Sequence, residues 1–492
     1  MDKLKISENG RYFINADGAP FVWLADTVWT MPQRMKWDDV EYLMQKRKSQ
    51  GFTVLQIVAL DPERDVQMRS PAGDAALLYD NLRTPNEKYF EYLDWIIDKA
   101  EEYGFYVLLL PVWGQLVVGD DWAGGVFPKT VTEENAYGYG EWIGRRYREK
   151  KHILWCLGGD RQPVHKGVDY RNVWRRMAEG LAKGVLGKAL KYNVKDPAWE
   201  DLLITYHACH EAETGECSTL SYWDGEEEAW IRFVMLQSGH GLLPKNYELV
   251  AKEYANSHVR PVWDGEPAYE MMITTFPPVD ESYHGTWMVR RRAYWSMLSG
   301  SFGHTYGHAS VWCTIGEKER SIMTQYSWYE ALQSEGSGQM KYLREIMEDL
   351  RLMTCLPASG IVAGQDGSEE MNSHVAVSED ADGKFVCAYL PGGGSVRLDL
   401  SKLPAVPASE RGRLYMWWWN PSDGRFYDQK NQQTEASQEI SAADGFLSVT
   451  APTEGEEKDW VLILMTEDTD APVKDKVYYQ LEQAEHHHQC GR

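Results

Sequence analysis

The sequence predicts an α/β fold: an eight-stranded (β/α)8 TIM barrel followed by a small antiparallel β-sandwich domain. Three observations support this prediction. Eight short apolar runs recur along the first 355 residues, with helical patterns between most of them, as a parallel barrel requires. Beyond residue 356 the pattern changes to short alternating strands separated by turn residues. At 492 residues the chain is long enough for a barrel and a second module.

The eight candidate strands are short, apolar on both faces and rich in Val, Ile, Leu and aromatic residues. Such strands are typical of a sheet that is packed on both faces. We assign them to residues 21–25, 52–60, 105–112, 152–157, 202–206, 231–236, 261–263 and 302–306.

Helical patterns lie between these strands. One helix is predicted from Asp38, as its N-cap, to Gly51. A second begins at Thr84-Pro85, where a capping hydroxyl precedes a proline at the first helical position, and ends at Gly104. Further helices are predicted over residues 133–150, 170–183, 247–257, 287–299 and 339–353. The segment after the fifth strand is poorly defined by its pattern.

The last third of the chain has the pattern of an antiparallel β domain. Strands are predicted over residues 373–377, 383–389, 395–400, 413–419 and 459–465, with turns at 392–394, 420–421 and 423–424. We therefore divide the chain into a barrel over residues 1–355, a β-sandwich over 356–468 and a polar tail over 469–492. The tail ends near three histidines and is expected to be disordered, so we exclude it from function.

Composition and charge exclude several classes of partner. The net charge of −23 argues against nucleic acid and anionic membrane surfaces, which require basic patches. No stretch approaches the length of an apolar membrane span. The seven cysteines are irregularly spaced and predict no disulfide framework. The first residues lack the apolar core of a signal peptide, so we expect a cytoplasmic protein unless a leader was trimmed.

Two carboxylates stand where predicted strands end. Glu266 follows the seventh run and precedes a proline, and Asp160 follows Gly158-Gly159 at the end of the fourth run. In a parallel barrel the carboxyl ends of the strands deliver side chains to one shared face. Two carboxylates on that face are the minimal equipment for cleaving a glycosidic bond. The pair therefore predicts a carbohydrate-cleaving site.

Each carboxylate also has a structural interpretation. Glu266 could cap the next helix or pair with one of the arginines at 290–292. Asp160 could pair with Arg161 or cap the helix near Tyr170. We favour the catalytic interpretation for both, because glycines before Asp160 and proline after Glu266 hold the acids at strand ends.

The predicted geometry also indicates the stereochemical outcome. Side chains from strands four and seven would meet across the mouth of the barrel, near the ~5 Å separation of a retaining pair. Glu266 would then be the nucleophile, and Asp160 the general acid and later the base. Because a free aspartate has a pKa of about 3.9, the site would have to raise the pKa of Asp160 through burial and the nearby charge.

Several segments together resemble the apiosidase-like glycoside hydrolases, whose barrel precedes a small β domain named for collagen binding. The resemblance covers nearly the whole chain. It rests on the segments 21–29, 47–56, 157–160, 264–270 and 301–312, which include Leu157-Gly-Gly-Asp160 and Asp264-Gly-Glu-Pro-Ala-Tyr-Glu270. The resemblance implies that Asp160 is the acid/base and Glu266 the nucleophile, and that apiose is released from a pectic side chain. The wider barrel clan usually has Asn-Glu at the end of strand four, where this chain has Gly159-Asp160.

Other polar residues near the predicted strand ends are candidates for binding sugar hydroxyls. Asp26 ends strand one and Gln56 lies in strand two, and a buried, satisfied polar group is the alternative for each. Four histidines on strands five and eight could face the pocket. The remaining candidates are the residue directly after strand seven and the last residue of strand eight. The full predicted set of polar substrate contacts is Asp26, Gln56, His207, His210, Asp264, His304, Tyr306 and His308.

The histidines raise the alternative of a metal site, because hydrolytic barrels can hold zinc. Metal-dependent barrel hydrolases of the amidohydrolase kind have a His-x-His motif on strand one, and here that strand ends Leu-Ala-Asp-Thr. We therefore expect no metal and no other cofactor.

Tryptophan and tyrosine are abundant, at 21 and 28 residues against 12 Phe. Their flat apolar faces and hydrogen-bonding edges suit sugar rings, although most individual Trp are better interpreted as core. Five Trp are candidate sugar platforms, of which we expect about two to serve as such. They are Trp23, Trp113, Trp223, Trp263 and Trp312.

Long strand-to-helix loops are expected at residues 61–83, 113–131, 207–229 and 267–285. Loops on that face build the walls of a pocket, which favours removal of a terminal sugar over cleavage within a chain. Two other hypotheses remain: a carbohydrate-binding protein without catalysis, and a protein that binds matrix proteins through its β domain. The paired acids argue against the first, and the charge argues against the second. The sequence leaves the oligomeric state open.

Overall fold

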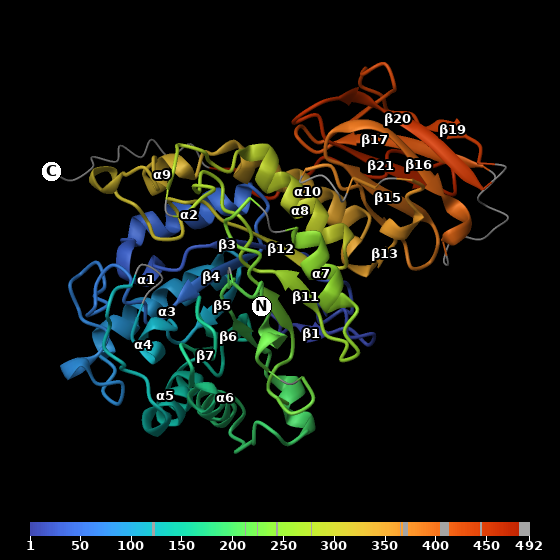
Figure 1. Cartoon of the computed structure of the whole chain (residues 1–492). Helices are drawn as coiled ribbons and strands as arrows, with labels where there is room; N and C mark the ends of the chain where they lie inside the picture. Colours follow the sequence, from blue (N-terminus) through green and yellow to red (C-terminus); the bar gives the residue numbers. More distant parts are fainter. Residues whose placement is uncertain are drawn as a thin grey trace.

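The structure is a computed structural model that describes residues 1–120, 124–211, 213–223, 225–242, 245–276, 278–364, 366–367, 372–403, 413–442 and 445–481. Within these residues a barrel of parallel strands precedes an antiparallel β domain, which lies against one side of the barrel (Figure 1). The predicted fold class is confirmed.

The barrel sheet contains eight parallel strands among the described residues, and each overlaps one of the predicted runs. Side chains at alternate positions point into the barrel, and the others point outward toward the helices. The strands are β3 (Trp23–Thr27), β4 (Val54–Val58), β5 (Tyr106–Leu110), β6 (Ile153–Gly158), β9 (Ile204–His207), β10 (Val234–Leu236), β11 (Val262–Asp264) and β12 (Gly303–Tyr306).

The barrel closes between β9 and β10 partly through a side chain. At the lower end the Arg232 backbone N–H donates to Ile204 O at 2.8 Å. Higher up, the Thr219 hydroxyl lies between the strands: it donates to Tyr206 O at 2.7 Å and accepts the Met235 N–H at 2.9 Å. Thr219 belongs to a 3-10 turn (Thr219–Ser221) in the segment that the sequence left poorly defined. Within the described residues no α-helix lies between β9 and β10.

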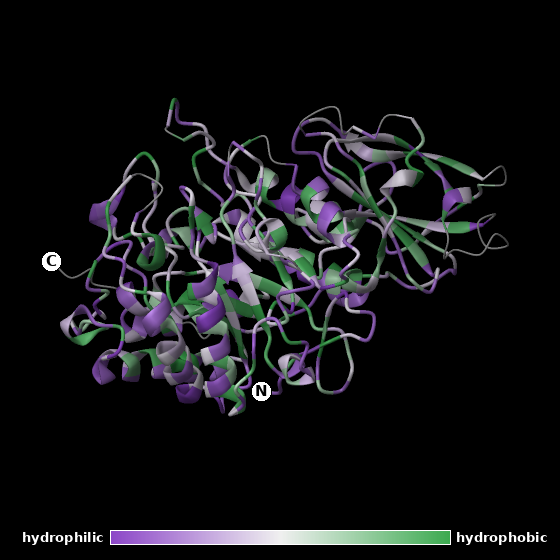
Figure 2. Cartoon of the chain, turned by 60° about the horizontal axis from the view of Figure 1, so that its bottom comes forward, coloured by the Kyte–Doolittle hydropathy of each residue, from purple (hydrophilic) through white to green (hydrophobic). Residues whose placement is uncertain are grey.

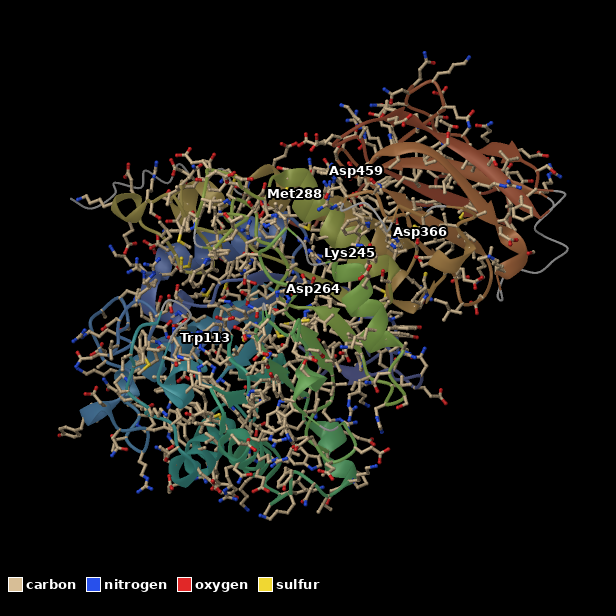
Figure 3. The ribbon with its side chains drawn as sticks, viewed as in Figure 1. Trp113, Lys245, Asp264, Met288, Asp366 and Asp459 are labelled. Carbon is tan, nitrogen blue, oxygen red and sulfur yellow. The ribbon has the colours of Figure 1, made fainter. Side chains whose placement is uncertain are left out.

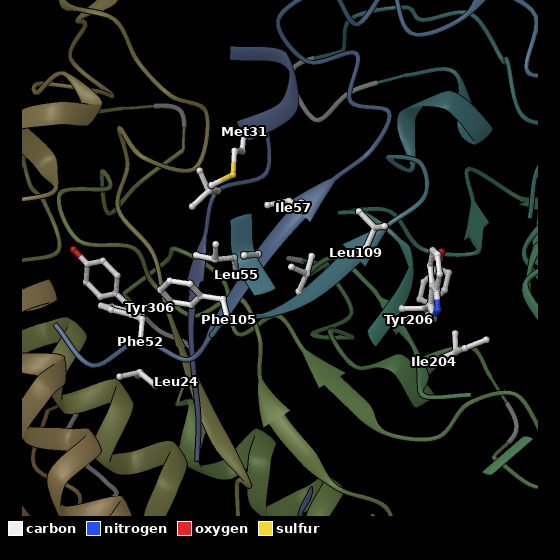
Figure 4. Packing of buried hydrophobic residues seen from close by; sticks show 14 of the residues in the cluster. Leu24, Met31, Phe52, Leu55, Ile57, Phe105, Leu109, Ile204, Tyr206 and Tyr306 are labelled. Carbon is white, nitrogen blue, oxygen red and sulfur yellow. The ribbon is translucent and has the colours of Figure 1, made fainter. Parts of the chain in front are cut away.

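Helices surround the barrel and bury their apolar faces on its outward-pointing residues. They are α1 (Met31–Arg34), α2 (Trp37–Ser49), α3 (Glu87–Glu102), α4 (Gln115–Val118), α5 (Glu133–Arg146), α6 (Arg171–Leu186), α7 (Asn246–Tyr254), α8 (Thr286–Leu298), α9 (Trp328–Ala331) and α10 (Glu335–Asp349). Leu55, Ile57 and Leu109 belong to this layer, together with Phe52 and Tyr306 (Figure 4). Hydrophobic residues gather in the strands, whereas hydrophilic residues prevail on the outer surfaces of the helices (Figure 2).

Three predicted helix starts were wrong. The helix predicted from residue 339 is α10, which begins at Glu335. Helix α2 begins at Trp37 with Lys36 as its N-cap, two residues before the predicted cap Asp38. Helix α3 begins at Glu87, where the Asn86 side chain accepts the Lys88 N–H. The Thr84 hydroxyl instead donates to Leu78 O at 2.7 Å, so it ties the preceding loop and does not cap the helix.

A short hairpin closes the lower end of the barrel. Strands β1 (Lys5–Ile6) and β2 (Phe13–Ile14) pair antiparallel, and the Phe13 ring lies 5.9 Å from Trp23 and 5.3 Å from Phe233. These rings fill the bottom of the barrel interior together with Trp263. A second small hairpin, β7 (Val164–His165) and β8 (Val168–Asp169), follows β6.

The C-terminal domain consists of two antiparallel sheets with an apolar core between them. One sheet contains β13 (Leu356–Pro357), β14 (Ala376–Glu379), β15 (Phe385–Leu390), β17 (Leu414–Asn420), β18 (Arg425–Tyr427), β19 (Gln438–Ile440) and β21 (Trp460–Met465). The other pairs β16 (Gly393–Asp399) with β20 (Phe446–Glu454). Strand β20 was not predicted from the sequence, although its buried and exposed residues alternate along the first six positions.

The larger sheet is buried on both faces. One face packs on the smaller sheet. The other contributes Tyr389, Trp417 and Ile463 to the apolar core that the barrel helices also form. The Tyr389 ring stacks on Tyr294 of α8 at 5.1 Å, and the Trp287 indole N–H donates to Pro391 O at 3.0 Å. The β domain is therefore packed firmly on α8.

The expectation of a disordered tail does not hold for residues 469–481, which lie along α10. The Lys474 N–H donates to Asp349, and the Lys476 ammonium lies 2.9 Å from Glu348 and 2.7 Å from Asp349. The Tyr478 ring lies under the Arg344 guanidinium at 3.8 Å. Paired charges, together with the burial of Val473 in the apolar core, hold this segment against the barrel. The three histidines at 486–488 lie outside the described residues.

Among the described residues, we find no helix whose length and apolar character together would let it cross a bilayer.

Candidate active site

Glu266 follows β11 and is held in place from beneath. The Gln56 side chain, inside the barrel, donates to Gly265 O at 3.1 Å and to Thr27 at 3.2 Å. Its carbonyl accepts the Thr305 hydroxyl at 3.1 Å. Gln56 thus joins β3, β4 and β12 to the residue before Glu266. Gln56 is therefore a buried polar group with its hydrogen bonds satisfied, and it fixes the backbone next to the acid. This is the alternative that the sequence left open beside a sugar contact.

The Glu266 carboxylate lies between two imidazoles. His240 Nε2 is 3.2 Å from Oε1, and His207 Nε2 is 3.0 Å from Oε2. The His207 contact is close, although its angles fall outside hydrogen-bond geometry. The phenol of Tyr269, three residues along the chain, also faces the carboxylate. Glu266 is 6% exposed.

These neighbours decide the charge of Glu266. Burial raises the pKa of its carboxyl, but the contacts with His207 and His240 lower it by more, so the pKa lies well below its usual range. Glu266 is therefore ionised at neutral pH, as a nucleophile must be. The same charge, after burial, raises the pKa of Tyr269 far above its usual value, so the phenol keeps its proton.

Asp160 reaches the mouth of the barrel through an unusual backbone. Gly158, Gly159 and Asp160 all have left-handed conformations, with φ of 85°, 108° and 49°. A Cβ on Gly158 would lie 2.4 Å from His207 O, and one on Gly159 would lie 2.6 Å from the Trp113 ring. The two glycines are therefore required for the sharp turn that ends β6.

Both carboxylate oxygens of Asp160 have donors. Gln237 Nε2 donates to Oδ1 at 2.9 Å, and Arg161 Nη1 donates to Oδ2 at 2.9 Å. The Arg161 pairing that the sequence offered as an alternative is thus present. The Arg161 guanidinium also contacts Asp120 O at 3.3 Å, which ties Asp160 to the loop after β5.

His207 connects the two acids. The Asp160 backbone N–H donates to His207 Nδ1 at 3.0 Å. That nitrogen must therefore be unprotonated, and the proton of a neutral ring lies on Nε2, which faces Glu266. The tautomer is thus assigned from the hydrogen-bond pattern. One buried side chain from β9 holds the main chain of one acid and the carboxylate of the other.

Three of the residues that contact the two acids were not predicted from the sequence. Gln237 and His240 lie in the loop after β10, and Tyr269 lies three residues after Glu266. A usable signal was present: the polar run Gln237-Ser-Gly-His240 comes directly after an apolar strand, as Asp160 does. Trp29 was also missed, although it lies two residues beyond β3 on the inward side.

Aromatic rings line the site beside His207. The Trp29 and Trp113 rings lie 5.3 Å apart, and both are within 5.7 Å of the His207 ring. Trp113 lies in the barrel and away from the β domain (Figure 3). His210 is partly buried beside Gln237, whose carbonyl accepts the His210 N–H at 2.6 Å. The structure thus places Trp113 and His210 beside residues that contact the two acids.

Four predicted substrate contacts lie elsewhere, because they occupy outward positions of their strands. Asp26 forms a fully buried ion pair with Arg47 of α2, at 2.6 Å. Tyr306 donates to Glu270 at 2.5 Å behind the sheet. Asp264 accepts from Ser238 at 2.7 Å and from Asn246 at 3.1 Å. The fourth is His304, which is 1% exposed.

The remaining candidates other than Trp312 are also buried. Trp312 is partly buried and packs against a small apolar cluster that includes Tyr269. His308 is 0% exposed, and its Nδ1 accepts the Ser310 N–H at 3.0 Å. Burial lowers the pKa of His304 and of His308 to about 3, so both rings are neutral. Trp23 and Trp263 are at the barrel interior, and Trp223 packs on Trp230. The structural framework of the barrel therefore includes His304, His308, Trp23, Trp223 and Trp263.

Across the described ranges, no three His, Cys, Asp or Glu side chains come together in an arrangement that would hold a metal ion. A cavity of about 430 Å³ opens at the opposite end of the barrel, between the segment before β3 and α10. Its lining includes neither Asp160 nor Glu266, and it takes no part in the site.

A parallel barrel that presents two acids after its fourth and seventh strands, one of them buried and ionised, has the architecture of a glycoside hydrolase. The family model described as "Apiosidase-like, catalytic domain" matches residues 7–354, and the chain belongs to this family. A second family model, described as "Putative collagen-binding domain of a collagenase", matches residues 356–465.

Solved structures agree with this assignment. A glycoside hydrolase family 5 protein from Bacteroides vulgatus is 26% identical, with a TM-score of 0.77 over 94% of this chain and 93% of that chain. A structure named glycoside hydrolase is 25% identical, with a TM-score of 0.76 over 94% of this chain and 97% of that chain. No curated protein matches the chain.

Proposed function

We propose that the protein is a retaining glycoside hydrolase that removes a terminal sugar from a plant-type oligosaccharide or glycoside. The observation that carries this proposal is the placement of Glu266 against His207 and His240, which keeps a buried carboxylate ionised. A buried carboxylate without such contacts would take up a proton and would not serve as a nucleophile.

In the first step, a Glu266 oxygen attacks the anomeric carbon and forms a glycosyl ester. The bond from that carbon to the leaving oxygen breaks, and Asp160 gives its proton to this oxygen. In the second step, Asp160 takes a proton from water as the water attacks the anomeric carbon. The ester bond breaks, and Glu266 returns as a carboxylate.

The resting site places one demand on this mechanism. Gln237 and Arg161 already occupy the two oxygens of Asp160. Proton donation to a leaving group therefore requires at least one of these donors to move aside when substrate binds. Apo geometry of catalytic groups commonly tightens or rearranges in the substrate complex.

Trp113, with Trp29 packed behind it, supplies the aromatic side of the proposed sugar site. Both rings lie within 5.7 Å of the His207 ring, and Trp113 is 6% exposed against 1% for Trp29, so Trp113 is the ring that a sugar over Glu266 would meet. Its apolar face suits the C–H face of a sugar. The family to which the chain belongs makes apiose a first sugar to test.

A panel of aryl glycosides and plant oligosaccharides tests the proposal. We expect release of a terminal sugar from at least one member, and early product NMR should show the anomeric configuration of the substrate. Release of the opposite anomer would refute retention. Binding of several sugars without turnover of any would instead favour a carbohydrate-binding protein.

A further inference from the structure

One short segment, residues 237–241 after β10, contacts both acids. Gln237 donates to Asp160 and His240 contacts Glu266. Between them the Gly239 N–H donates to Glu266 O at 3.1 Å, and the Ser238 hydroxyl donates to Asp264 at 2.7 Å. We call it the 237–241 segment. Its backbone position fixes the donors to both carboxylates at once.

Two buried side chains, the His284 imidazole and the Arg292 guanidinium, hold this segment by donating to its backbone carbonyls. His284 Nε2 donates to His240 O at 2.5 Å, and Arg292 Nη2 donates to Gly241 O at 2.9 Å. Burial lowers the pKa of His284 to about 3, so its ring is neutral. Burial, with help from Arg291, lowers the pKa of Arg292 to about 10, and Asp264 opposes this, so Arg292 stays charged at neutral pH.

Arg292 is the last of three consecutive arginines on α8, all buried. The first two reach the C-terminal domain. Arg290 forms a two-point ion pair with Asp459, at 2.8 and 2.5 Å, and Asp459 also accepts the Tyr389 hydroxyl at 2.9 Å. Arg291 donates to Asn372 Oδ1 at 2.5 Å and lies over Trp287 and Trp295, 4.6 Å from each ring.

Successive residues of a helix project about 100° apart. The three arginines therefore give α8 two contacts with the β domain and one with the 237–241 segment. Figure 3 shows Asp459 beside α8, on which Met288 is labelled. Asp459 and Asn372 of the β domain hold α8 through Arg290 and Arg291. By fixing the rotation of α8 and its position along its axis, they also fix where the Arg292 guanidinium lies.

We propose that the C-terminal domain is part of the active-site framework, and that Arg292 is a positioning residue through which α8 holds the 237–241 segment. The β domain then acts on catalysis through Asp459 and Asn372 and does not need to bind a ligand itself. The structural link is independent of the reaction. Its effect on turnover rests on the proposed function.

Hydrogen exchange of the whole chain measures the link without any substrate. Asp459→Asn removes the charge that pairs with Arg290, and Arg292→Met removes the donor to Gly241. We expect both variants to raise amide exchange in the 237–241 segment. The matched control is Glu439→Gln, which breaks the exposed 2.8 Å pair with Arg413 in the same β domain and should leave the segment at the wild-type rate.

Kinetics add a readout that a merely structural role would not change. Glu266 faces His207 from β9, His240 from the 237–241 segment and Tyr269 from the loop after β11. If Arg292→Met displaces His240, one contact that favours the carboxylate is lost, and the acid limb of kcat/KM moves to higher pH. We expect kcat to fall by about tenfold to a hundredfold, with KM little changed, and Arg292→Lys to recover part of the loss.

Raised exchange confined to the β domain in Asp459→Asn, with the segment unchanged, would overturn the proposal. The proposal would also be overturned if the acid limb of the kcat/KM profile of Arg292→Met stayed at its wild-type pH. If Asp459→Asn does not fold, Asn372→Ala, which cuts only the contact to Arg291, takes its place with the same expected rise in exchange. A wild-type protein that cleaves no glycoside would defeat the proposed function, while the exchange result would still decide the framework.

Discussion

His207 and Glu266 meet at 3.0 Å inside the mouth of the barrel, and the other nitrogen of the same imidazole accepts the backbone N–H of Asp160. Because Nδ1 is engaged by Asp160, the Nε2 proton faces Glu266. The orientation of one ring is thus shared by two acids on strands that lie apart in the barrel.

Removal of the His207 imidazole is expected to move the acid limb of kcat/KM to higher pH. The contact lowers the pKa of Glu266, so its loss raises that pKa, and a larger fraction of the carboxyl is protonated at moderately acid pH. A pH–rate profile of His207→Gln measures the shift. His258→Gln is the control, because His258 pairs with Glu226 on the surface. An unshifted limb would contradict the assignment of Glu266 as the ionised nucleophile.

Loss of Glu266 is expected to abolish turnover of activated and natural substrates alike, because no nucleophile remains. Glu266→Ala should fold normally, since the residue is at a strand end and not in the apolar core. Steady-state rates and a thermal unfolding curve check both statements. Glu281→Ala, at an exposed carboxylate of the rim, should retain wild-type rates. Residual activity in Glu266→Ala close to that of the control would exclude Glu266 as the nucleophile.

The variant Asp160→Ala should separate substrates by their leaving groups. With a sugar as leaving group, we expect a loss of about 10²- to 10⁴-fold, the usual contribution of general acid catalysis. With an activated aryl leaving group the first step should be nearly normal, the covalent intermediate should accumulate, and azide should speed its release. Equal damage on both substrates, with no effect of azide, would show that another residue is the acid/base.

Gly159→Ala should impair the site by displacing the backbone that carries Asp160, without removing any catalytic side chain. The added Cβ would lie 2.6 Å from the Trp113 ring in a conformation with φ of 108°. We expect activity to fall by at least about tenfold, since small misplacements of a catalytic group are costly. The control is Gly138→Ala, at an open and exposed position of α5, which should stabilise the helix by up to about 1 kcal/mol. Normal activity in Gly159→Ala would show that the turn tolerates a side chain.

Asp26→Asn tests whether this acid is framework or sugar contact. The substitution leaves Arg47 buried without its partner, and breaking a buried pair costs about 3–5 kcal/mol. Denaturant unfolding should show this loss, with KM unchanged in protein that remains folded. Asp65→Asn, which breaks an exposed pair with Arg69, should cost less than about 1 kcal/mol. A raised KM with unchanged stability would restore the sugar-binding role.

The sequence by itself determined the barrel, the change to a β domain and the two acids. Apolar runs covered on both faces define the strands, and Gly158-Gly159 before Asp160 and the proline after Glu266 place each acid at a strand end. These signals are local, because they depend on residues next to one another in the chain. The helix starts at Trp37 and Glu87 depended on competing caps, which the sequence does not rank.

Only the tertiary structure decided which face of each strand a side chain occupies. Asp26 and Thr27 are neighbours, yet Asp26 pairs with Arg47 outside the barrel and Thr27 contacts Gln56 inside it. Where both faces of a strand are apolar, the sequence carries no alternation that would assign them. Likewise, the contacts of His207 and His240 with Glu266 join segments far apart in the chain, and the closure of the barrel alone brings them together.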